Sequence, residues 1–294
     1  MVEKWVVMDR IRAGAAGLTL ALTVTACGSS DPANVSTTDP GIGHVHGLGV
    51  DPGDGSVYVA AHYGLFKLTS VDTALRVAGR VQDHMGFTIT GPKTFLASGH
   101  PSADAITPGG SPHLGLIRST DAGATWTTVS EGGVADFHAL QVVGDSLYAY
   151  DSQTGTVRRS GDGGATWLPG TESQVLDLGG NAAEPDSVYA TTLRGIHRST
   201  NGGLSFSPMK NTPLLSHIES PGKGVLVGPA ADGRIHLSRD AGKTWTPEAA
   251  LPEQATAFTA VNQQRMLAAM ENGTVLESRN GGRDFTVIFR PATS

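Results

Sequence analysis

A motif of eight residues recurs five times in the chain, and its spacing constrains the fold more than any other feature of the sequence. Each copy begins with Ser, has Asp or Asn third and Gly fifth, and ends with Trp or Phe. The copies begin at Ser119, Ser160, Ser199, Ser238 and Ser278, so the repeat is 39 to 41 residues long. A period of this length is typical of repeat architectures in which each unit forms one supersecondary element.

Each repeat is predicted to contain four short strands, because apolar runs alternate with turns rich in Gly, Pro and Asp. In the fourth copy we expect strands at 216–220, 225–228, 234–238 and after Trp245. A degenerate sixth unit precedes the others, with strands expected at 46–50, 57–62, 65–69 and 75–77. Four-stranded units arranged in a ring form a β-propeller. The sequence therefore predicts an all-β, six-bladed β-propeller over residues 42–294, and it leaves a seventh blade open.

The composition agrees with many turns and short strands. The chain has 39 Gly and 16 Pro among its 294 residues, and 16% of residues are charged. This balance argues against an all-helical protein. The net charge of −6 becomes −7 once the first 26 residues are removed. Phosphate binding needs a clustered positive surface, so nucleic acid is a poor candidate partner.

The N-terminal segment is predicted to be a secretory signal. Residues 13–26 are apolar and uncharged, follow two arginines, and are too few to span a bilayer permanently. The segment ends in Val-Thr-Ala-Cys27, which resembles the bacterial lipobox and implies that Cys27 receives a diacylglycerol and further acylation such as palmitate. We therefore expect a signal peptide at 1–26, a lipidated Cys27 and flexible linker at 27–41, and an extracytoplasmic propeller anchored to the cell membrane.

The residues of the repeated motif are predicted to be structural. Ser and Asp side chains can bond backbone amides of a turn, Gly can adopt a positive φ, and the aromatic residue can pack into the blade. The acids are therefore not expected to be catalytic. The structural positions are Asp121, Trp126, Asp162, Trp167, Asn201, Phe206, Asp240, Trp245, Asn280 and Phe285.

This motif resembles the Asp-box, or BNR repeat, of sialidases and sortilin-type receptors. The segments 44–51, 61–66, 83–87 and 99–101 further resemble a group of actinobacterial surface lipoproteins that are labelled glycosyl hydrolases or exo-sialidases. The resemblance implies a propeller fold and, as one alternative, a sialidase-like glycoside hydrolase. A shared fold hosts many functions, however, so no catalytic residue is carried over from it.

The histidines are predicted to gather on one face of the propeller, opposite the repeated motif. In a four-stranded meander, the entry to strand one and the turn between strands two and three share a face. Aligned first strands form a column around the channel: His46, Met85, His138, Leu176, His217 and Ala257. Eight of the ten histidines can lie on or near this face, including His113 in the long loop 99–114. The two others, His197 and His236, are expected to be ordinary packing residues.

This face is the predicted binding site. The candidate ligand-binding residues are His44, His46, His62, His84, His100, His138 and His217. The sharpest form of the hypothesis is a copper or zinc site built from His44, His46, Met85, His138 and His217, because imidazole with thioether suits copper and imidazole with carboxylate suits zinc. A polar channel without metal remains an alternative.

Two other functions stay open. Sialic-acid cleavage would draw on Tyr63, Glu271, Asp83, Arg80, Arg194 and Arg234. The first-strand column contains no Arg, so the sequence favours a protein that is not an enzyme. A protein-binding scaffold is the further alternative. The expected partners are the membrane, through Cys27, and a metal ion, small ligand or glycan; we expect a monomer.

Overall fold

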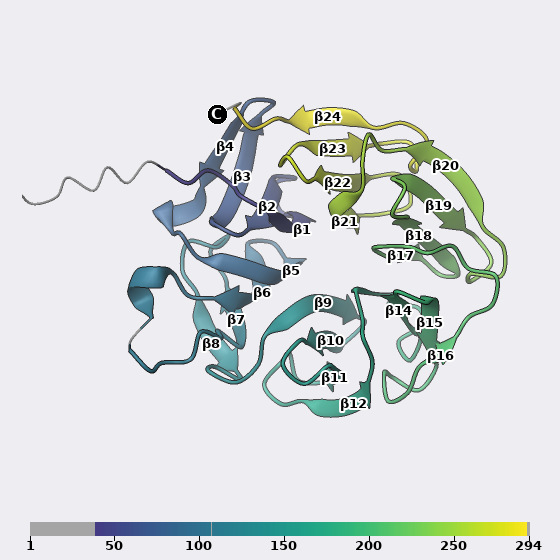
Figure 1. The fold of residues 1–294 in the computed structure, drawn as a ribbon, viewed down its shortest axis with the longest axis horizontal. Coiled ribbons are helices and arrows are strands. Elements are labelled where there is room, and N and C mark those ends of the chain that lie inside the picture. The colour runs from purple at the N-terminus through teal and green to yellow at the C-terminus, as the bar shows by residue number, and fades with distance from the viewer. Residues whose placement is uncertain (1–38, 107, 293–294) are drawn as a thin grey trace, which may run out of the picture. The chain divides into compact units, whose positions relative to one another are not determined.

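Six four-stranded antiparallel sheets surround a central opening (Figure 1). This computed structural model describes residues 39–106 and 108–292. The predicted signal peptide, Cys27 and most of the linker lie outside the described residues. The described part of the chain contains no helix that is long and apolar enough to cross a membrane. Each sheet is one blade, and its four strands follow one another in the sequence.

The strands of the first three blades have the following bounds. Blade 1 contains β1 (Val45–Val50), β2 (Val57–Ala61), β3 (Gly64–Ser70) and β4 (Thr73–Arg76). Blade 2 contains β5 (Asp83–Gly91), β6 (Thr94–His100), β7 (Leu116–Ser119) and β8 (Thr127–Ser130). Blade 3 contains β9 (Phe137–Val143), β10 (Ser146–Asp151), β11 (Thr156–Ser160) and β12 (Leu168–Glu172).

The other three blades complete the ring. Blade 4 contains β13 (Asp177–Gly180), β14 (Val188–Thr192), β15 (Gly195–Ser199) and β16 (Ser207–Pro208). Blade 5 contains β17 (Glu219–Gly222), β18 (Val225–Pro229), β19 (Arg234–Ser238) and β20 (Thr246–Ala250). Blade 6 contains β21 (Ala255–Ala260), β22 (Met266–Met270), β23 (Val275–Ser278) and β24 (Thr286–Phe289). Short 3-10 turns, η1 (Val77–Gly79) and η2 (Ala103–Ala105), lie in the connections.

The predicted six-bladed fold is confirmed, and the described residues contain no seventh blade. The degenerate first unit forms blade 1. One predicted strand is wrong at its start, because β17 begins at Glu219 instead of residue 216. Upstream of it, Leu215 forms only an isolated bridge with Ala230. Pro213 before the strand and Pro221 within it both lack the N–H that a regular ladder needs.

The core lies between adjacent blades. The second strands are sandwiched between neighbouring blades, so β14 and β22 are buried along their whole length and are apolar on both faces, apart from the threonines at the end of β14. Between blades 2 and 3, Leu116 packs in one cluster with Phe137, whose ring centroid lies 4.8 Å from that of Trp167. Trp167 also donates from its Nε1 to Ser130 Oγ of blade 2 at 2.9 Å, so the motif aromatic joins its own blade to the preceding one.

The repeated motif forms the hairpin between the third and fourth strands, as predicted. In blade 3, Ser160 Oγ donates to Asp162 Oδ1 at 2.7 Å and accepts from the Gly164 amide at 2.8 Å. Asp162 accepts from the amide and hydroxyl of Thr166, and these hydrogen bonds lower the pKa of Asp162 to about 2. Gly164 has a φ of +91°, and a Cβ there would lie 2.0 Å from Leu116 Cδ2 of blade 2. The glycine therefore lets the hairpin close against the preceding blade.

The ring closes without a strand shared between its first and last blades. The innermost strands β1 and β21 pack against each other, and the Arg290 amide donates to the Val71 carbonyl at 2.7 Å. The end of the described chain accordingly lies beside β3 and β4 (Figure 1). Among the described residues, closure depends on packing, on this backbone bond and on the His44–Glu271 pair at 3.4 Å.

Candidate metal centre

The innermost strands contain bulges near their ends on the histidine face, opposite the repeated motif, and these bulges set the direction of the site residues. The register of β1 against β2 shifts between Val45 and Gly47, which leaves His46 unpaired. The same shift leaves Met85 unpaired in β5 and His138 unpaired in β9. A bulge inserts one residue and re-aims its side chain. His46 and His138 both line the cavity of about 360 Å³ in the central channel.

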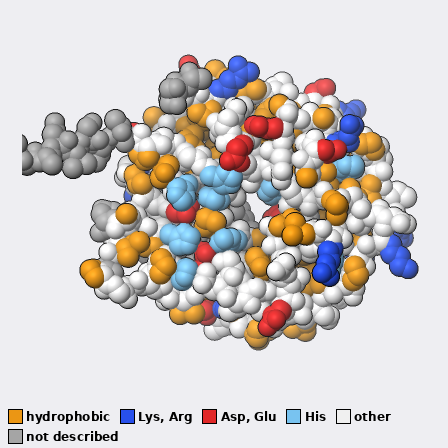
Figure 2. Space-filling model, viewed as in Figure 1, with side chains coloured by type: hydrophobic (Ala, Val, Ile, Leu, Met, Phe, Trp, Pro, Cys, Tyr) orange, Lys and Arg blue, Asp and Glu red, His pale blue; other side chains and the backbone are white. Residues whose placement is uncertain are grey.

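Six histidines gather on one side of the channel mouth, over blades 1 to 3 (Figure 2). They are His44, His46, His62, His100, His113 and His138. Carboxylates lie among them, whereas the Lys and Arg side chains visible on this face lie near its rim. We call these histidines, together with Asp83 and Asp136, the His/Asp cluster.

The first half of the cluster is centred on Asp83. Its Oδ1 lies 3.5 Å from His46 Nε2, and its Oδ2 lies 3.2 Å from His62 Nδ1. One donor atom from each of these residues lies within 4.8 Å of the others, close enough to hold one ion. Asp83 opens β5, and His62 directly follows β2, so the group is built where two adjacent blades meet.

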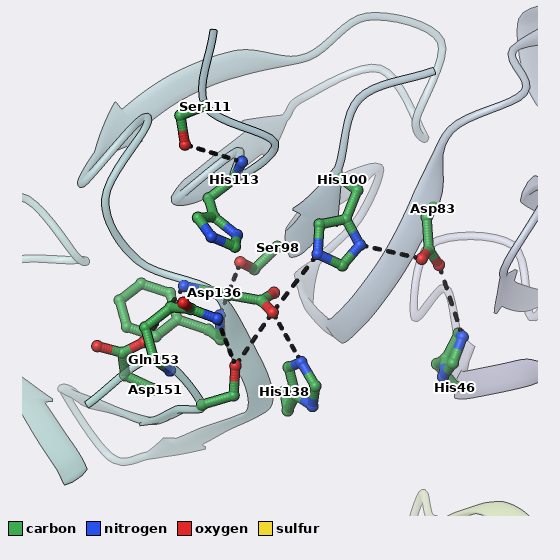
Figure 3. A network of polar contacts seen from close by, with 12 residues as sticks. His46, Asp83, Ser98, His100, Ser111, His113, Asp136, His138, Asp151 and Gln153 are labelled. Carbon is green, nitrogen blue, oxygen red and sulfur yellow. Dashed lines mark hydrogen bonds and ion pairs between the residues drawn. The ribbon is translucent and has the colours of Figure 1, made fainter. Parts of the chain in front are cut away.

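The second half is centred on Asp136, which directly precedes β9. Its Oδ2 lies 2.8 Å from His138 Nε2 and 3.5 Å from His100 Nε2. His100, His113 and Asp136 also bring one donor atom each within 4.8 Å of one another. His113 comes from the long loop of blade 2, and its ring centroid is 5.7 Å from that of His100 (Figure 3).

Several donor atoms in the cluster are buried and lack a hydrogen-bond partner among the described residues. They are His46 Nε2, Asp83 Oδ1, His113 Nδ1 and Asp136 Oδ1. The Asp83 and Asp136 side chains are only 11% and 4% exposed. Leaving a buried polar atom unsatisfied costs about 1–3 kcal/mol. The four atoms divide evenly between the two halves of the cluster.

Burial also controls the charge of the cluster. It lowers the pKa of His46 to about 4, although the negative charge of Asp83 acts in the opposite direction. Burial raises the pKa of Asp136, but the hydrogen bond and positive charge of His138, with the charge of His100 and the hydrogen bond of Ser152, outweigh it and lower the pKa overall. His46 is thus neutral and Asp136 ionised near pH 7, and these are the forms that bind metals.

Asp136 is held in place by neighbouring strands. Its amide donates to Asp151 Oδ1 at 3.3 Å, and its Oδ2 accepts from Ser152 at 3.1 Å. Asp151 is fully buried and lies 2.6 Å from Arg158 Nη2. These contacts, several of which are drawn in Figure 3, orient a residue of the site from a second layer.

Three of the predicted residues do not join the cluster, and a fourth lies at its edge. His84 is 1% exposed and packs with its ring centroid 5.3 Å from that of Trp126, because it alternates with Asp83 along β5. Met85 occupies the bulge equivalent to His46 but is absent from the cavity lining. His217 lies two residues before β17 and lines the channel. Burial lowers the pKa of His217, and the negative charge of Asp177 acts in the opposite direction. His44 contacts the His46 ring edge-on, with 4.8 Å between ring centroids, and pairs with Glu271 at 3.4 Å, at the edge of the cluster.

The predicted first-strand column is displaced by one residue in two blades. In blade 4 Leu176 precedes the strand and Asp177 lines the channel instead. In blade 6 Ala257 is buried in the core, and Thr256 is the residue in the bulge. A slip of one residue moves a side chain to the opposite face of a strand, and the bulges conceal that slip in the sequence.

Sequence reasoning also missed two acids inside the channel. Asp177 and Glu219 both line the cavity, and burial raises the pKa of each, that of Glu219 to about 8. The signal that could have found them is their place at the start of a first strand. Glu219 was obscured because its strand was expected to begin three residues earlier.

The residues of the sialidase alternative are spread over several blades. Arg80 follows η1, Arg194 lies in the turn before β15, and Arg234 opens β19. The described residues that line the central cavity include no Arg or Lys. Tyr63 packs with its ring centroid 4.8 Å from that of His62, while Glu271 pairs with His44.

Comparison with known proteins supports the fold. No protein-family model and no curated protein sequence matches this chain. A propeller of the nidogen/laminin complex is 12% identical over 80% of this chain and 93% of that one, with a TM-score of 0.61. A YCF48 protein bound to a peptide is 14% identical over 84% of this chain and 83% of that one, with a TM-score of 0.52.

Glycoside hydrolases are also among the structural neighbours. The GH74 enzyme of Niastella koreensis is 18% identical over 84% of this chain, with a TM-score of 0.55. This chain spans only 45% of that enzyme's length. At such low identity these likenesses show the fold alone. The chain is therefore a six-bladed β-propeller that carries a His/Asp cluster with two buried carboxylates at one side of its channel mouth.

Proposed function

We propose that this protein binds a divalent transition-metal ion through His46, His62 and Asp83. The observation that carries the proposal is the pair of buried atoms, His46 Nε2 and Asp83 Oδ1, that lie 3.5 Å apart with no hydrogen bond. A cation between them would satisfy both. It would also leave open coordination positions for water or a small ligand.

The donor set favours Zn(II) or Cu(II). Two imidazoles and a carboxylate are borderline to hard donors that suit these ions. Cu(I) prefers thiolate and thioether ligands, and Met85 does not line the cavity. A polar channel without metal is less favourable, because it would leave several buried polar atoms without partners. Stable polar networks in proteins pair such atoms.

The setting of the site is also part of the proposal. We infer that the chain belongs among Asp-box propellers. This is supported by two hydrogen bonds repeated in all five hairpins, one from Ser to Asp or Asn and one from the Gly amide to Ser. A lipid on Cys27 would hold the propeller outside the cell membrane on a flexible linker. The cluster would then face the extracytoplasmic medium and take metal from it.

The test is metal content of the purified full chain. All samples carry Cys27→Ser, which removes the single thiol as a competing ligand. After incubation with Zn(II) or Cu(II) and desalting, we expect bound metal that is lost from the His46→Ala/His62→Ala double variant. His197→Ala/His236→Ala is the matched control, because both histidines lie in third strands outside the cluster. A wild-type chain that stays empty, or a cluster variant that still fills, overturns the proposal.

Glycoside hydrolysis and protein binding are the other candidate functions. The first is favoured only by the GH74 neighbours and the second by neighbours whose structures contain a peptide or a protein partner. The hydrolase alternative requires that Tyr63→Phe abolish release of a sugar from a sialoside or glycan panel. The same panel with metal-loaded chain separates hydrolysis from metal binding.

A further inference from the structure

We propose that the His/Asp cluster holds two metal ions that share the imidazole of His100 as a bridge. The inference rests on the proposed metal-binding function and extends it to a second ion. The first ion would lie among His46, His62 and Asp83, and the second would lie beside Asp136. His100 stands between them.

The second donor group carries its own evidence. His113 Nδ1 and Asp136 Oδ1 are buried and have no hydrogen-bond partner among the described residues, just as in the first group. His100, His113 and Asp136 bring their donor atoms within 4.8 Å of one another. His138 Nε2 adds a further imidazole at 2.8 Å from Asp136 Oδ2. The first ion explains none of these contacts.

The two nitrogens of His100 face two different carboxylates (Figure 3). Its Nδ1 lies 3.1 Å from Asp83 Oδ2, and its Nε2 lies 3.5 Å from Asp136 Oδ2. With metal–ligand bonds of about 2.0–2.1 Å, neighbouring ligand atoms on one ion lie about 2.9–3.4 Å apart. The separations around His100 are close to this range on both sides of the ring, so small side-chain movements would complete each site.

Proton accounting favours the bridge. Without metal, His100 can donate to both carboxylates only as an imidazolium, because a neutral imidazole has one N–H. When each nitrogen binds one ion, His100 releases each of its N–H protons to solvent and forms two metal–nitrogen bonds. The resulting imidazolate and the two carboxylates carry three negative charges against four positive ones. The pair of ions thus nearly neutralises the buried acids.

The second half of the cluster is assembled by blades 2 and 3 alone. His100 ends β6, Asp136 precedes β9 and His138 lies in the β9 bulge. The long blade 2 loop brings His113 over the same point, and the Leu114 amide fixes that loop to the Gly99 carbonyl at 2.9 Å. In this proposal the long loop of blade 2 supplies His113 as a ligand of the second ion.

The test uses Cu(II), whose unpaired electron reports the bridge. The full chain with Cys27→Ser is titrated with Cu(II), and bound copper is counted by elemental analysis and by integrated electron paramagnetic resonance. We expect two ions per chain and an integrated signal that falls below half of the copper present, because imidazolate couples the two spins. His100→Ala should abolish that loss of signal, whereas the control His236→Ala should retain it.

The outcomes separate this inference from the proposed function. No bound copper overturns the bridged pair, and a chain that binds neither copper nor zinc overturns both proposals. One bound ion that is lost from the His46→Ala/His62→Ala variant supports the proposed function and overturns the second site. Two bound ions with full signal intensity overturn the bridge. A His113→Ala/His138→Ala variant that retains one ion with full signal supports a second site at Asp136.

Discussion

Removing the Asp151 carboxylate should destabilise the propeller and weaken metal binding together. Asp151 is fully buried and accepts from Arg158 at 2.6 Å, from the Thr154 hydroxyl at 2.8 Å, and from two backbone amides. One of these amides belongs to Asp136. Asp151→Ala therefore leaves a nearly buried guanidinium without its main partner and releases the backbone that holds a cluster carboxylate.

The magnitude follows from what remains around Arg158. Breaking a buried ion pair by removing one partner costs about 3–5 kcal/mol. Arg158 is 14% exposed and keeps Glu131 at 3.1 Å, so we expect the lower end, about 3 kcal/mol. Arg158→Met measured alone and with Asp151→Ala closes a double-mutant cycle, which should give a coupling of about 1–3 kcal/mol. Metal affinity should fall about tenfold through the displaced Asp136, as is usual for partners of metal ligands.

The assay is urea unfolding followed by tryptophan fluorescence, combined with metal titration of the same samples. Trp126 and Trp167 lie in the hairpins of blades 2 and 3, and Asp151 ends β10 of blade 3, so their fluorescence should report unfolding of this part of the ring. A loss of less than about 1 kcal/mol would show that the buried pair is not a major contributor, contrary to the contacts described. Loss of stability with unchanged metal affinity would refute the link from Asp151 to Asp136.

Three further changes test separate features. Gly99→Ala should weaken metal binding and lower the free energy of unfolding by about 1–3 kcal/mol, because φ is +146° there and a Cβ would lie 2.3 Å from the Asp83 carbonyl oxygen. Urea unfolding and metal titration measure the two effects. A variant with unchanged stability and metal affinity would contradict this packing. Burial raises the pKa of Glu219 to about 8, so the folded state takes up protons that the unfolded state lacks, and stability falls as pH rises from about 4.5 to 8. Glu219→Gln should remove that loss, up to about 5 kcal/mol, and thermal unfolding at pH 5 and 8 should show a gain only at the higher pH. Ser160→Ala should cost about 1–3 kcal/mol in urea unfolding, because the buried Gly164 amide loses its acceptor; a matched Ser207→Ala change, at an exposed serine of β16, should cost nothing.

The fold could be predicted from sequence because its signals are local. The motif beginning at Ser160 contains its own turn chemistry, and five copies at one spacing count the blades directly. Even the degenerate first blade is recognisable from its four strand-length apolar runs. The start of β17 was misplaced because its strand is irregular and its prolines interrupt the ladder.

The candidate site was only partly predictable. His46, His62, His100 and His138 were expected at one face because strand ends and connections determine the face of a propeller. The central roles of Asp83 and Asp136 depend on how closely adjacent blades pack, and a single sequence does not give the distance between blades. His84 and Asp83 adjoin in the chain yet point to opposite sides of β5, a distinction that the unpaired residue in the bulge obscures.

The consecutive strands of every blade have a consequence for how the chain can be cut and rejoined. No strand is exchanged between blades 6 and 1, so the chain can in principle be opened at any connection between blades. Joining residue 292 to residue 39 through a short linker should allow new termini in any of the five existing connections between blades. Apart from the outlying His44–Glu271 pair, the cluster lies within residues 46–138, the first three blades to leave the ribosome. The proposed site is thus contained in the first half of the ring, and the later half closes the circle around the channel.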